Sequence, residues 1–542
     1  MTTQASTSVL DLNADADWLN LVDSLSGADL TPAAANIVEQ FREAGARSAL
    51  VEHDYLDRDY SEEFSVFYSR LFQRYRRRTR RLHFFRADLA TVAERGGLMA
   101  VVAEMQACAG PERGDYLGFI VVRPVEDAPI GRAVLGFVSA PEGMRACVQV
   151  RATYETHPLG TTLSVRGIAF TQQDQRISAC AQASIWVSGR HFHTRHGGPW
   201  FSTSAITEAA SKPTDFVVSS SLPAGSSGLG VNNMLRALRA MDRHPYAFAG
   251  DLTKDGDIAW HPSLPPQAAL ARYVGSGIPV IAGLAPWKAG QGDGHAVVVI
   301  GDTFAPLTTP SLQVSRPTIA EFSPYFLVHD DQRGPNLRMA VRPGSADAET
   351  PYNIQEHLRF LIVPLPDKVF ITAETAEIKA WDRLEFYRDR WDGLKARHGA
   401  VIGGSIALAE RALQGLAQNL VVARTYLTMG WKYKLRLRDA APSNAIQSRI
   451  AIHELPRMVW VTEFGLLEDL NKFEPADRRI FGHCVTDATS TGPSQSPLVI
   501  HLPGFLWLTS HADPEFFATA EEVLYPLRDD TLYPPRIRGG RA

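Results

Sequence analysis

The spacing of hydrophobic residues divides the chain into three regions. In residues 1–160, apolar residues first recur at three- and four-residue steps, which is typical of helices, and then form short apolar runs typical of strands. The helical segments are "PAAANIVEQFREAG" and "FSVFYSRLFQRYRRRTRR", and the strand segments include "RRLHFFR" and "YLGFIVVRPV". We therefore expect an N-terminal α+β region over 1–160.

Residues 161–345 place helices before a sheet. After the strand pattern "TTLSVRGIAF" come a helix of small residues, "ACAQASIWVSGRH", and the helical patterns "TSAITEAASK" and "VNNMLRALRAMDRH". Three strand patterns follow: "IPVIAGLAPW", "HAVVVIGDTF" and "YFLVHDD". In residues 346–542, strand patterns such as "HLRFLIVPLP" flank the long helical pattern "AEIKAWDRLEFYRDRWDGLKARHG". This predicts a second domain over 161–345 and a C-terminal α+β region over 346–542.

Composition narrows the class of protein. A chain of 542 residues is too long for one hydrophobic core, and 45% hydrophobic with 21% charged residues is ordinary for a soluble globular protein. The net charge of −4 favours neither nucleic acid nor an anionic membrane as partner. The sequence has no secretory signal pattern, no apolar run of about 18 residues, and no CxxC pair among its four cysteines. We expect a cytoplasmic, multi-domain protein without a cofactor or a structural metal.

Cys180 is the first candidate for chemistry. A cysteine reacts as its thiolate, and the unpaired N–H groups of a helix N-terminus favour negative charge. Ser178 is a plausible N-cap, which would put Cys180 in the first helical turn. The small residues that follow keep the helix thin enough to pack closely on a sheet. By itself, Cys180 could equally be a small core residue.

A nucleophilic cysteine needs a base and a group that orients the base. His295 begins the apolar strand pattern "HAVVVIG" directly after the glycine-rich "AGQGDG", a position that leaves space around an imidazole. Asp330 and Asp331 end the strand pattern "YFLVHDD". If the two strands are neighbours, Asp330 can meet His295, with Asp331 as the alternative. Both aspartates could instead simply begin a turn.

An acyl-transfer site also needs donors for an oxyanion. The backbone N–H of Cys180 is one, and a glutamine upstream can supply a side-chain amide. Gln172, Gln173 and Gln175 all lie in the turn before the helix.

These features, in this order, resemble the papain-like superfamily of cysteine peptidases. "GHAVVVIG" followed by "FLVHDD" looks most like the bacteriocin-processing, C39-like peptidases, over roughly 165–345. The resemblance implies a papain-like domain, in which a helix bearing the cysteine packs on an antiparallel sheet carrying His and Asp. It implies Cys180 as nucleophile, His295 as general base, Asp330 as its orienter, and Gln173 in the oxyanion hole. The chain departs from the family in reading Ala-Cys-Ala where Asp-Cys-Gly is usual.

The resemblance predicts a cysteine protease or isopeptidase that acts on a peptide or protein substrate, without nucleic acid or membrane as partner. An acyltransferase of the transglutaminase or phytochelatin-synthase type would use the same acyl-enzyme. An inactive papain-like binding scaffold is the alternative outside enzymes. The family includes enzymes that cleave after double glycine, so the resemblance offers self-processing at Gly539 and Gly540 as one alternative, and an ordinary Arg-rich tail as the other.

Two other groups of residues suggest metal or thiol chemistry. His191, His193 and His196 form an H-x-H-x2-H pattern, but residues two apart on a helix face different ways. We expect cationic histidines at a helix C-terminus rather than a zinc site. His483 and Cys484 are adjacent on a strand, so their side chains should point to opposite faces.

A run of seven arginines between Arg74 and Arg86 could bind phosphate or an acidic partner. The preceding segment "EHDYLDRDYSEE" is acidic, so we expect the two segments to form an internal salt-bridged face instead.

Overall fold

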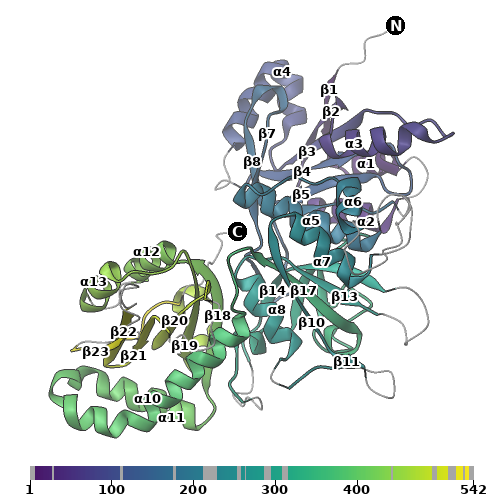
Figure 1. Ribbon diagram of the computed structural model, residues 1–542. Helices are drawn as coiled ribbons and strands as arrows, with labels where there is room; N and C mark the ends of the chain where they lie inside the picture. The colour runs from purple at the N-terminus through teal and green to yellow at the C-terminus, as the bar shows by residue number, and fades with distance from the viewer. Residues whose placement is uncertain are drawn as a thin grey trace.

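The computed structural model describes three large antiparallel sheets, each covered by helices, and two small two-stranded sheets (Figure 1). The first belongs mainly to the N-terminal part of the chain, the second to the middle and the third to the C-terminal part. Every pair of named strands among the described residues is antiparallel, and helices are present in all three parts, so the predicted α+β class is confirmed. The described residues are 6–26, 30–109, 114–174, 179–211, 229–252, 258–262, 264–285, 294–307, 315–440, 444–490, 497–510, 521–528 and 531–535.

The first sheet has the strand order β1-β2-β3-β4-β5-β9 and is covered on both faces. Along β4, Phe119 and Val121 enter one apolar cluster while Ile120 and Val122 enter another, as the two-residue period of a strand requires. The elements of this part are β1 (Thr7–Asp11), α1 (Asp15–Ser26), α2 (Pro32–Glu43), β2 (Ser48–Tyr55), α3 (Arg58–Val66), β3 (Thr79–Phe85), α4 (Leu89–Cys108), β4 (Tyr116–Val122), β5 (Ile130–Leu135), the hairpin β7 (Ala152–Thr156) with β8 (Leu163–Gly167), and β9 (Ala169–Phe170).

The second sheet has the order β10-β17-β13-β14-β15-β16, and β6 pairs with the far end of β14. Helices α5 and α8 both contact β14, its central strand. The elements are β6 (Arg145–Val148), α5 (Cys180–His196), α6 (Thr203–Ser211), α7 (Val231–Ala240), β10 (Arg243–Ala249), β11 (Asp251–Leu252), β12 (Ile258–Ala259), α8 (Pro266–Gly275), β13 (Val280–Leu284), β14 (His295–Phe304), β15 (Tyr325–Asp330), β16 (Gly334–Ala340), α9 (Ile354–His357) and β17 (Leu358–Pro366).

The third sheet runs in sequence order from β18 to β23 and lies between two helix pairs (Figure 1). Helices α10 and α11 pack on one face, and α12 and α13 on the other. The elements are α10 (Ala373–Ile402), α11 (Ile406–Ala417), β18 (Val421–Met429), α12 (Gly430–Ala440), α13 (Asn444–Ile452), β19 (Met458–Leu466), α14 (Leu467–Leu470), β20 (Gly482–Asp487), β21 (Val499–Leu502), β22 (Phe505–Ser510) and β23 (Glu521–Pro526).

Three strands join sheets on the other side of the boundaries expected at 160 and 345. β6 precedes residue 160 but pairs with β14 of the second sheet. β9 follows residue 160 and pairs with β5 of the first. β17 follows residue 345 and lies between β10 and β13. The second sheet is therefore assembled from segments of all three expected regions.

The helix expected over 64–81 is wrong. Helix α3 ends at Val66, and after one short 3-10 turn the chain has no regular structure until β3 begins. Tyr60 and Tyr68 pack with Val125 and Ala128 in a small separate cluster, so tertiary packing of the aromatic residues bends the segment.

One ion pair recorded among the described residues joins the acidic and the basic segment. Arg81 pairs with Glu52. The acidic residues of α3 and its N-cap pair instead with arginines elsewhere in the chain: Asp57 with Arg132, Asp59 with Arg190, and Glu63 with Arg123.

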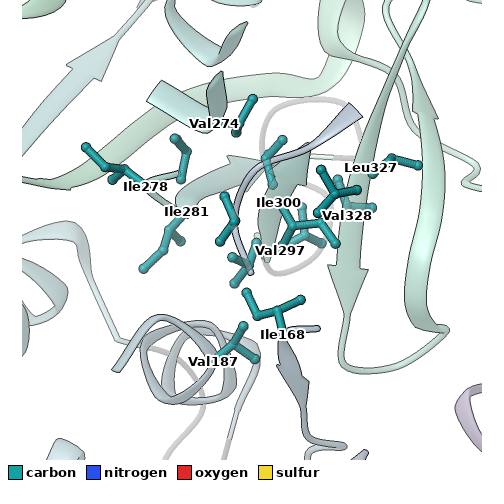
Figure 2. Packing of buried hydrophobic residues seen from close by; sticks show 14 of the residues in the cluster. Ile168, Val187, Val274, Ile278, Ile281, Val297, Ile300, Leu327 and Val328 are labelled. Carbon is teal, nitrogen blue, oxygen red and sulfur yellow. The ribbon is translucent and has the colours of Figure 1, made fainter. Parts of the chain in front are cut away.

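The second sheet has an apolar core that reaches the helix bearing Cys180. Figure 2 shows Val187 of α5, Val297 of β14 and Val328 of β15 in this cluster. Val274 of α8 and Ile281 of β13 belong to the same cluster. This core fixes α5 relative to the strands on which the candidate site is built. Among the described residues, no helix is long and apolar enough to cross a bilayer.

Candidate active site

Helix α5 begins at Cys180, so the predicted position of the thiol in the first helical turn is confirmed. The N-cap is Ala179, with extended backbone angles, and not Ser178, which lies outside the described residues. The Gln182 Oε1 atom accepts the Ala179 N–H at 3.3 Å, which satisfies one group of the helix end from inside the helix. Cys180 is half-buried.

Small side chains seat α5 closely against β14. The Ser184 hydroxyl, one turn after Cys180, donates a hydrogen bond of 3.1 Å to the carbonyl of Ala296. On another side of the helix, a Cβ at Gly189 would lie only 3.2 Å from the sulfur of Met241. The thin helix predicted from the sequence therefore has close neighbours on both strand and helix.

The N-terminal part of the chain also holds α5. Asp59 of α3 accepts a hydrogen bond from the Trp186 indole at 3.3 Å and pairs with the guanidinium of Arg190. All three side chains are buried. Buried charges are stable only when paired, so this contact fixes the helix from the side away from β14.

His295 begins β14, as the sequence predicts, and lies between Cys180 and Asp330. Its Nε2 atom is 3.1 Å from the Asp330 Oδ1 atom, a close ion pair rather than an aligned hydrogen bond. The Cys180 side chain is also close enough to the imidazole to raise its pKa. Because Nε2 faces the carboxylate, Nδ1 is the nitrogen left for the thiol. The Cys180 sulfur lies 4.0 Å from the carbonyl oxygen of Gly294, directly before the histidine.

The surroundings of His295 favour the imidazolium. Burial, the largest single influence, lowers the pKa of His295, but the contacts with Asp330 and Cys180 outweigh it and raise the pKa to about 10. A histidine with this pKa is protonated at neutral pH. It can therefore stabilise a thiolate beside it.

Asp330 ends β15 and is fully buried. Its Oδ1 atom accepts the backbone N–H of Gln332 at 2.9 Å, and its Oδ2 atom accepts the phenol of Tyr352 at 2.5 Å. Burial alone would raise the pKa of Asp330, but His295 and these donors lower it below its ordinary value. Asp330 is therefore an ionised carboxylate with a fixed orientation.

Asp331 is buried next to this pair. Neither of its carboxylate oxygens has a hydrogen-bond partner among the described residues. Burial raises the pKa of Asp331 to about 7; the charge of His295 lowers it and that of Asp330 raises it further. His295, Asp330 and Asp331 each present one ligand atom, all within 4.8 Å of one another, so their spacing is compatible with a divalent cation.

Gln173 lies in the segment that leads to α5 and is buried. Its neighbours are tied to the N-terminal part: Arg123 donates to the carbonyl of Gln172, and the Gln172 Oε1 atom accepts from Thr31 and from the backbone of Ile130. The side chain of Gln172 is thereby occupied away from the thiol. No contact is recorded between the Gln173 side chain and Cys180, His295 or Asp330 among the described residues, and Gln175 lies outside them.

The prediction that the histidines at the end of α5 are cationic is wrong for two of the three. Burial and the neighbouring Arg195 lower the pKa of His191 well below its ordinary value and that of His196 to about 4, so both are neutral. His191 bonds to the carbonyl of Gly277, and His193 to that of Gly198. Within the described part of the chain the three form no metal-ligand group.

His483 and Cys484 face opposite sides of β20, as expected. His483 contacts the phenols of Tyr433 and Tyr533, both at 2.6 Å, whereas Cys484 belongs to the core beneath α10. Burial raises the pKa of the Cys484 thiol to about 12. No thiol–imidazole pair forms there.

Two contributors to the site were not foreseen from the sequence: Tyr352, which bonds to Asp330, and Asp59, which holds α5. Tyr352 lies beyond the boundary expected at 345, and Asp59 lies in a segment expected to pair with arginines nearby. Neither contact could be predicted from the sequence. The position of Tyr352 near a turn and the acidic residues of α3 are local features, and they do not indicate which distant residue each side chain meets.

Comparison with known proteins adds little to this geometry. No family model and no curated protein matches the chain. Among solved structures, one match is the peptidase domain of Streptococcus ComA, a bifunctional ABC transporter involved in a quorum-sensing pathway. It is 14% identical, with a TM-score of 0.21, and the alignment covers 36% of this chain and 96% of that domain. A similarity of this size carries no argument about activity.

Proposed function

We propose that this chain is a cysteine peptidase or isopeptidase whose acyl-enzyme forms on Cys180. The observation that carries the proposal is the meeting of a thiol at a helix start, an imidazole at a strand start and a carboxylate at a strand end, in the order Cys180–His295–Asp330. These residues are separated in the chain by 115 and 35 positions, and no core-packing requirement needs a buried charged pair beside a half-buried thiol.

In the proposed reaction, the thiol proton already resides on His295 Nδ1 before the substrate binds, and the Cys180 thiolate attacks the carbonyl carbon of a peptide or isopeptide bond. The imidazolium then gives its proton to the leaving nitrogen as the C–N bond breaks, leaving a thioester on Cys180. Water attacks the thioester, its proton passes to His295, and the C–S bond breaks to release the acid. Asp330 keeps the ring oriented and stabilises its positive charge throughout.

The tetrahedral intermediate needs donors for its oxyanion. The backbone N–H of Cys180, at the first position of α5, has no partner within the helix and is the first donor. We assign the second to the amide of Gln173, because the amide of Gln172 is bound in the N-terminal part.

Alkylation of Cys180 by iodoacetamide between pH 4 and 10 tests the proposed pair without knowledge of the substrate. An unassisted thiol is about 1% thiolate at pH 6.5, so we expect labelling of Cys180 at this pH to be some 10–100-fold slower in His295→Ala than in the wild type. The other thiols serve as internal controls, since Cys108 and Cys484 are buried and burial also raises the pKa of Cys147 to about 12.

His329→Ala is the matched control variant. His329 is a buried histidine on β15, and burial lowers its pKa to about 3, so it carries no charge near neutral pH. Its removal should leave the labelling profile of Cys180 unchanged. Equal and slow labelling of Cys180 in the wild type and in His295→Ala would rule out the proposed pair and leave a binding scaffold. An enzyme with the pair should also accumulate a covalent adduct with an electrophilic peptide probe, seen by intact mass.

A further inference from the structure

Tyr352 lies outside the segment that carries the thiol, the base and the carboxylate, yet it contacts the carboxylate. It follows the β15–β16 hairpin and precedes α9. Its side chain is 3% exposed, and its hydroxyl donates a hydrogen bond of 2.5 Å to the Oδ2 atom of Asp330. Nothing in the packing of a buried aromatic ring requires its hydroxyl to end on an ionised carboxylate.

We propose that Tyr352 is a positioning residue that fixes the carboxylate of Asp330 and thereby the imidazole of His295. The inference rests on the proposed function of the Cys180–His295–Asp330 site. It adds a fourth member to the chain of contacts, from thiol to imidazole to carboxylate to phenol.

The two oxygens of Asp330 have separate partners. The Oδ1 atom faces His295 and the backbone N–H of Gln332, and the Oδ2 atom accepts the phenol. The half-exposed guanidinium of Arg333 is also near Oδ2, at 3.8 Å, which is beyond hydrogen-bond distance. The terminal torsion of an aspartate is soft, so contacts to one oxygen alone leave the carboxylate plane poorly determined. A donor on the second oxygen fixes that plane and keeps the Oδ1 atom directed at the Nε2 atom of His295.

The phenol is suited to this role because it stays protonated. Burial, and then the negative charge of Asp330, raise the pKa of Tyr352 well above its ordinary value. It is therefore a permanent donor. Its ring also lies beside the imidazole, with the ring centres 6.0 Å apart, so it closes the side of the His295–Asp330 pair that it faces.

The backbone around Tyr352 is held on both sides. The Thr350 hydroxyl donates to the carbonyl of Tyr352 at 2.8 Å, and Asn353 forms a bridge with Ala340 at the end of β16. Asn353 also caps α9 by accepting the N–H of Glu356 at 2.9 Å. The position of the phenol is thus set by the second sheet itself.

The test is the pH profile of Cys180 alkylation in Tyr352→Phe, which removes one oxygen and keeps the ring. Without the phenol, the carboxylate stabilises the imidazolium less, so the thiolate should form at higher pH. We expect the midpoint of the labelling profile to move upward by about one pH unit, and labelling at pH 6 to slow about 10-fold. Tyr387→Phe is the matched control, because this buried tyrosine donates to the carbonyl of Pro503 in the C-terminal part.

A double variant separates a role through Asp330 from a general loss of packing. If Tyr352 acts through the carboxylate, adding Tyr352→Phe to Asp330→Asn should leave the profile of Asp330→Asn unchanged. If Tyr352→Phe does not fold, Thr350→Val loosens the same segment and should move the midpoint in the same direction.

The outcomes for the two proposals are distinct. An unchanged midpoint in a folded Tyr352→Phe, together with fast His295-dependent labelling in the wild type, would overturn the role of Tyr352 and leave the proposed function intact. A midpoint that moves equally in Tyr387→Phe would also overturn it. Absence of His295-dependent labelling in the wild type would overturn both.

Discussion

The hydroxyl of Ser184 donates a hydrogen bond of 3.1 Å to the carbonyl of Ala296, and so joins α5 to β14 next to both reacting groups. Ser184 lies one turn after Cys180, and Ala296 follows His295 directly. The distance between the thiol and the imidazole therefore depends on how helix and strand meet at this bond.

Ser184→Ala should weaken this junction. Loss of one buried hydrogen bond is expected to lower the free energy of unfolding by about 1–2 kcal/mol, and a looser junction should slow alkylation of Cys180 at neutral pH. Ser188→Ala is the control, because the Ser188 hydroxyl donates to the carbonyl of Ser184 within the same helix. Equal labelling rates in the two variants would mean that the bond to Ala296 does not set the position of the thiol.

Asp330→Asn should shift the titration of His295. Burial lowers the pKa of His295, and the contacts with Asp330 and Cys180 raise it to about 10. Because the folded-state pKa exceeds the unfolded value of about 6.5, the stabilisation is complete below pH 6.5 and is lost as the pH rises through 10. In Asp330→Asn we expect the pKa to fall, which NMR of the imidazole C–H signals can follow.

A suitable control for Asp330→Asn is Asp302→Asn. Asp302 lies at the other end of β14 and accepts a hydrogen bond from Ser323 at 2.7 Å, away from the imidazole. The signal of His295 should titrate in Asp302→Asn as in the wild type. If the pKa of His295 were the same in Asp330→Asn as in the wild type, the proposed role of the carboxylate would be contradicted.

Asp331→Asn should raise the free energy of unfolding relative to the wild type, and by more at neutral pH than in acid. Burial, with a smaller contribution from the charge of Asp330, raises the pKa of Asp331 to about 7, so the unfolded chain loses this proton first. The resulting destabilisation of the wild-type protein is absent below about pH 4, grows between pH 4 and 7 and is complete above pH 7, with an upper bound of about 4 kcal/mol. Urea denaturation of both proteins at pH 4, 5.5 and 7.5 measures the growing difference, and the same series on the exposed Asp392→Asn is the control.

Glu377→Gln should weaken the contact between the second sheet and the C-terminal part. Arg272 of α8 donates to both carboxylate oxygens of Glu377 on α10, at 2.6 and 3.0 Å, and all of these groups are buried. Because Glu374 also pairs with Arg272, at 3.3 Å, the expected cost lies below the value of about 3–5 kcal/mol for a buried charge left with no partner. Asp382, on the same helix as Glu377, forms an exposed pair with Arg316. Asp382→Asn should therefore lower the free energy of unfolding by less than about 1 kcal/mol, and chemical denaturation of the two variants compares the two losses.

Chelation tests the spacing of His295, Asp330 and Asp331. From the sequence we predict a site that needs no metal, so treatment with EDTA should leave the rate of Cys180 alkylation unchanged. A faster rate after chelation would instead indicate that a cation occupied these ligand atoms and held the imidazole away from the thiol.

The sequence determined the local elements of the candidate site and the order in which they occur. A helix begins at Cys180, a strand begins at His295 and a strand ends at Asp330, because apolar periodicity and the small residues of α5 are properties of neighbouring positions. The proximity of His295 and Asp330 also followed from one assumption, that their strands are neighbours, and β14 does pair with β15.

Tertiary structure decided the partners that lie far away in the chain. The acidic residues near Asp59 could have paired with the arginines that follow them. In the folded chain α3 lies beside α5, and Asp59 pairs with Arg190 instead. Likewise β6 and β17 joined the second sheet from outside its expected bounds, and Tyr352 reached Asp330 from the segment between β16 and α9. Charge and hydrophobicity specify that such groups need partners, whereas only the close packing of whole elements selects which partner each one meets.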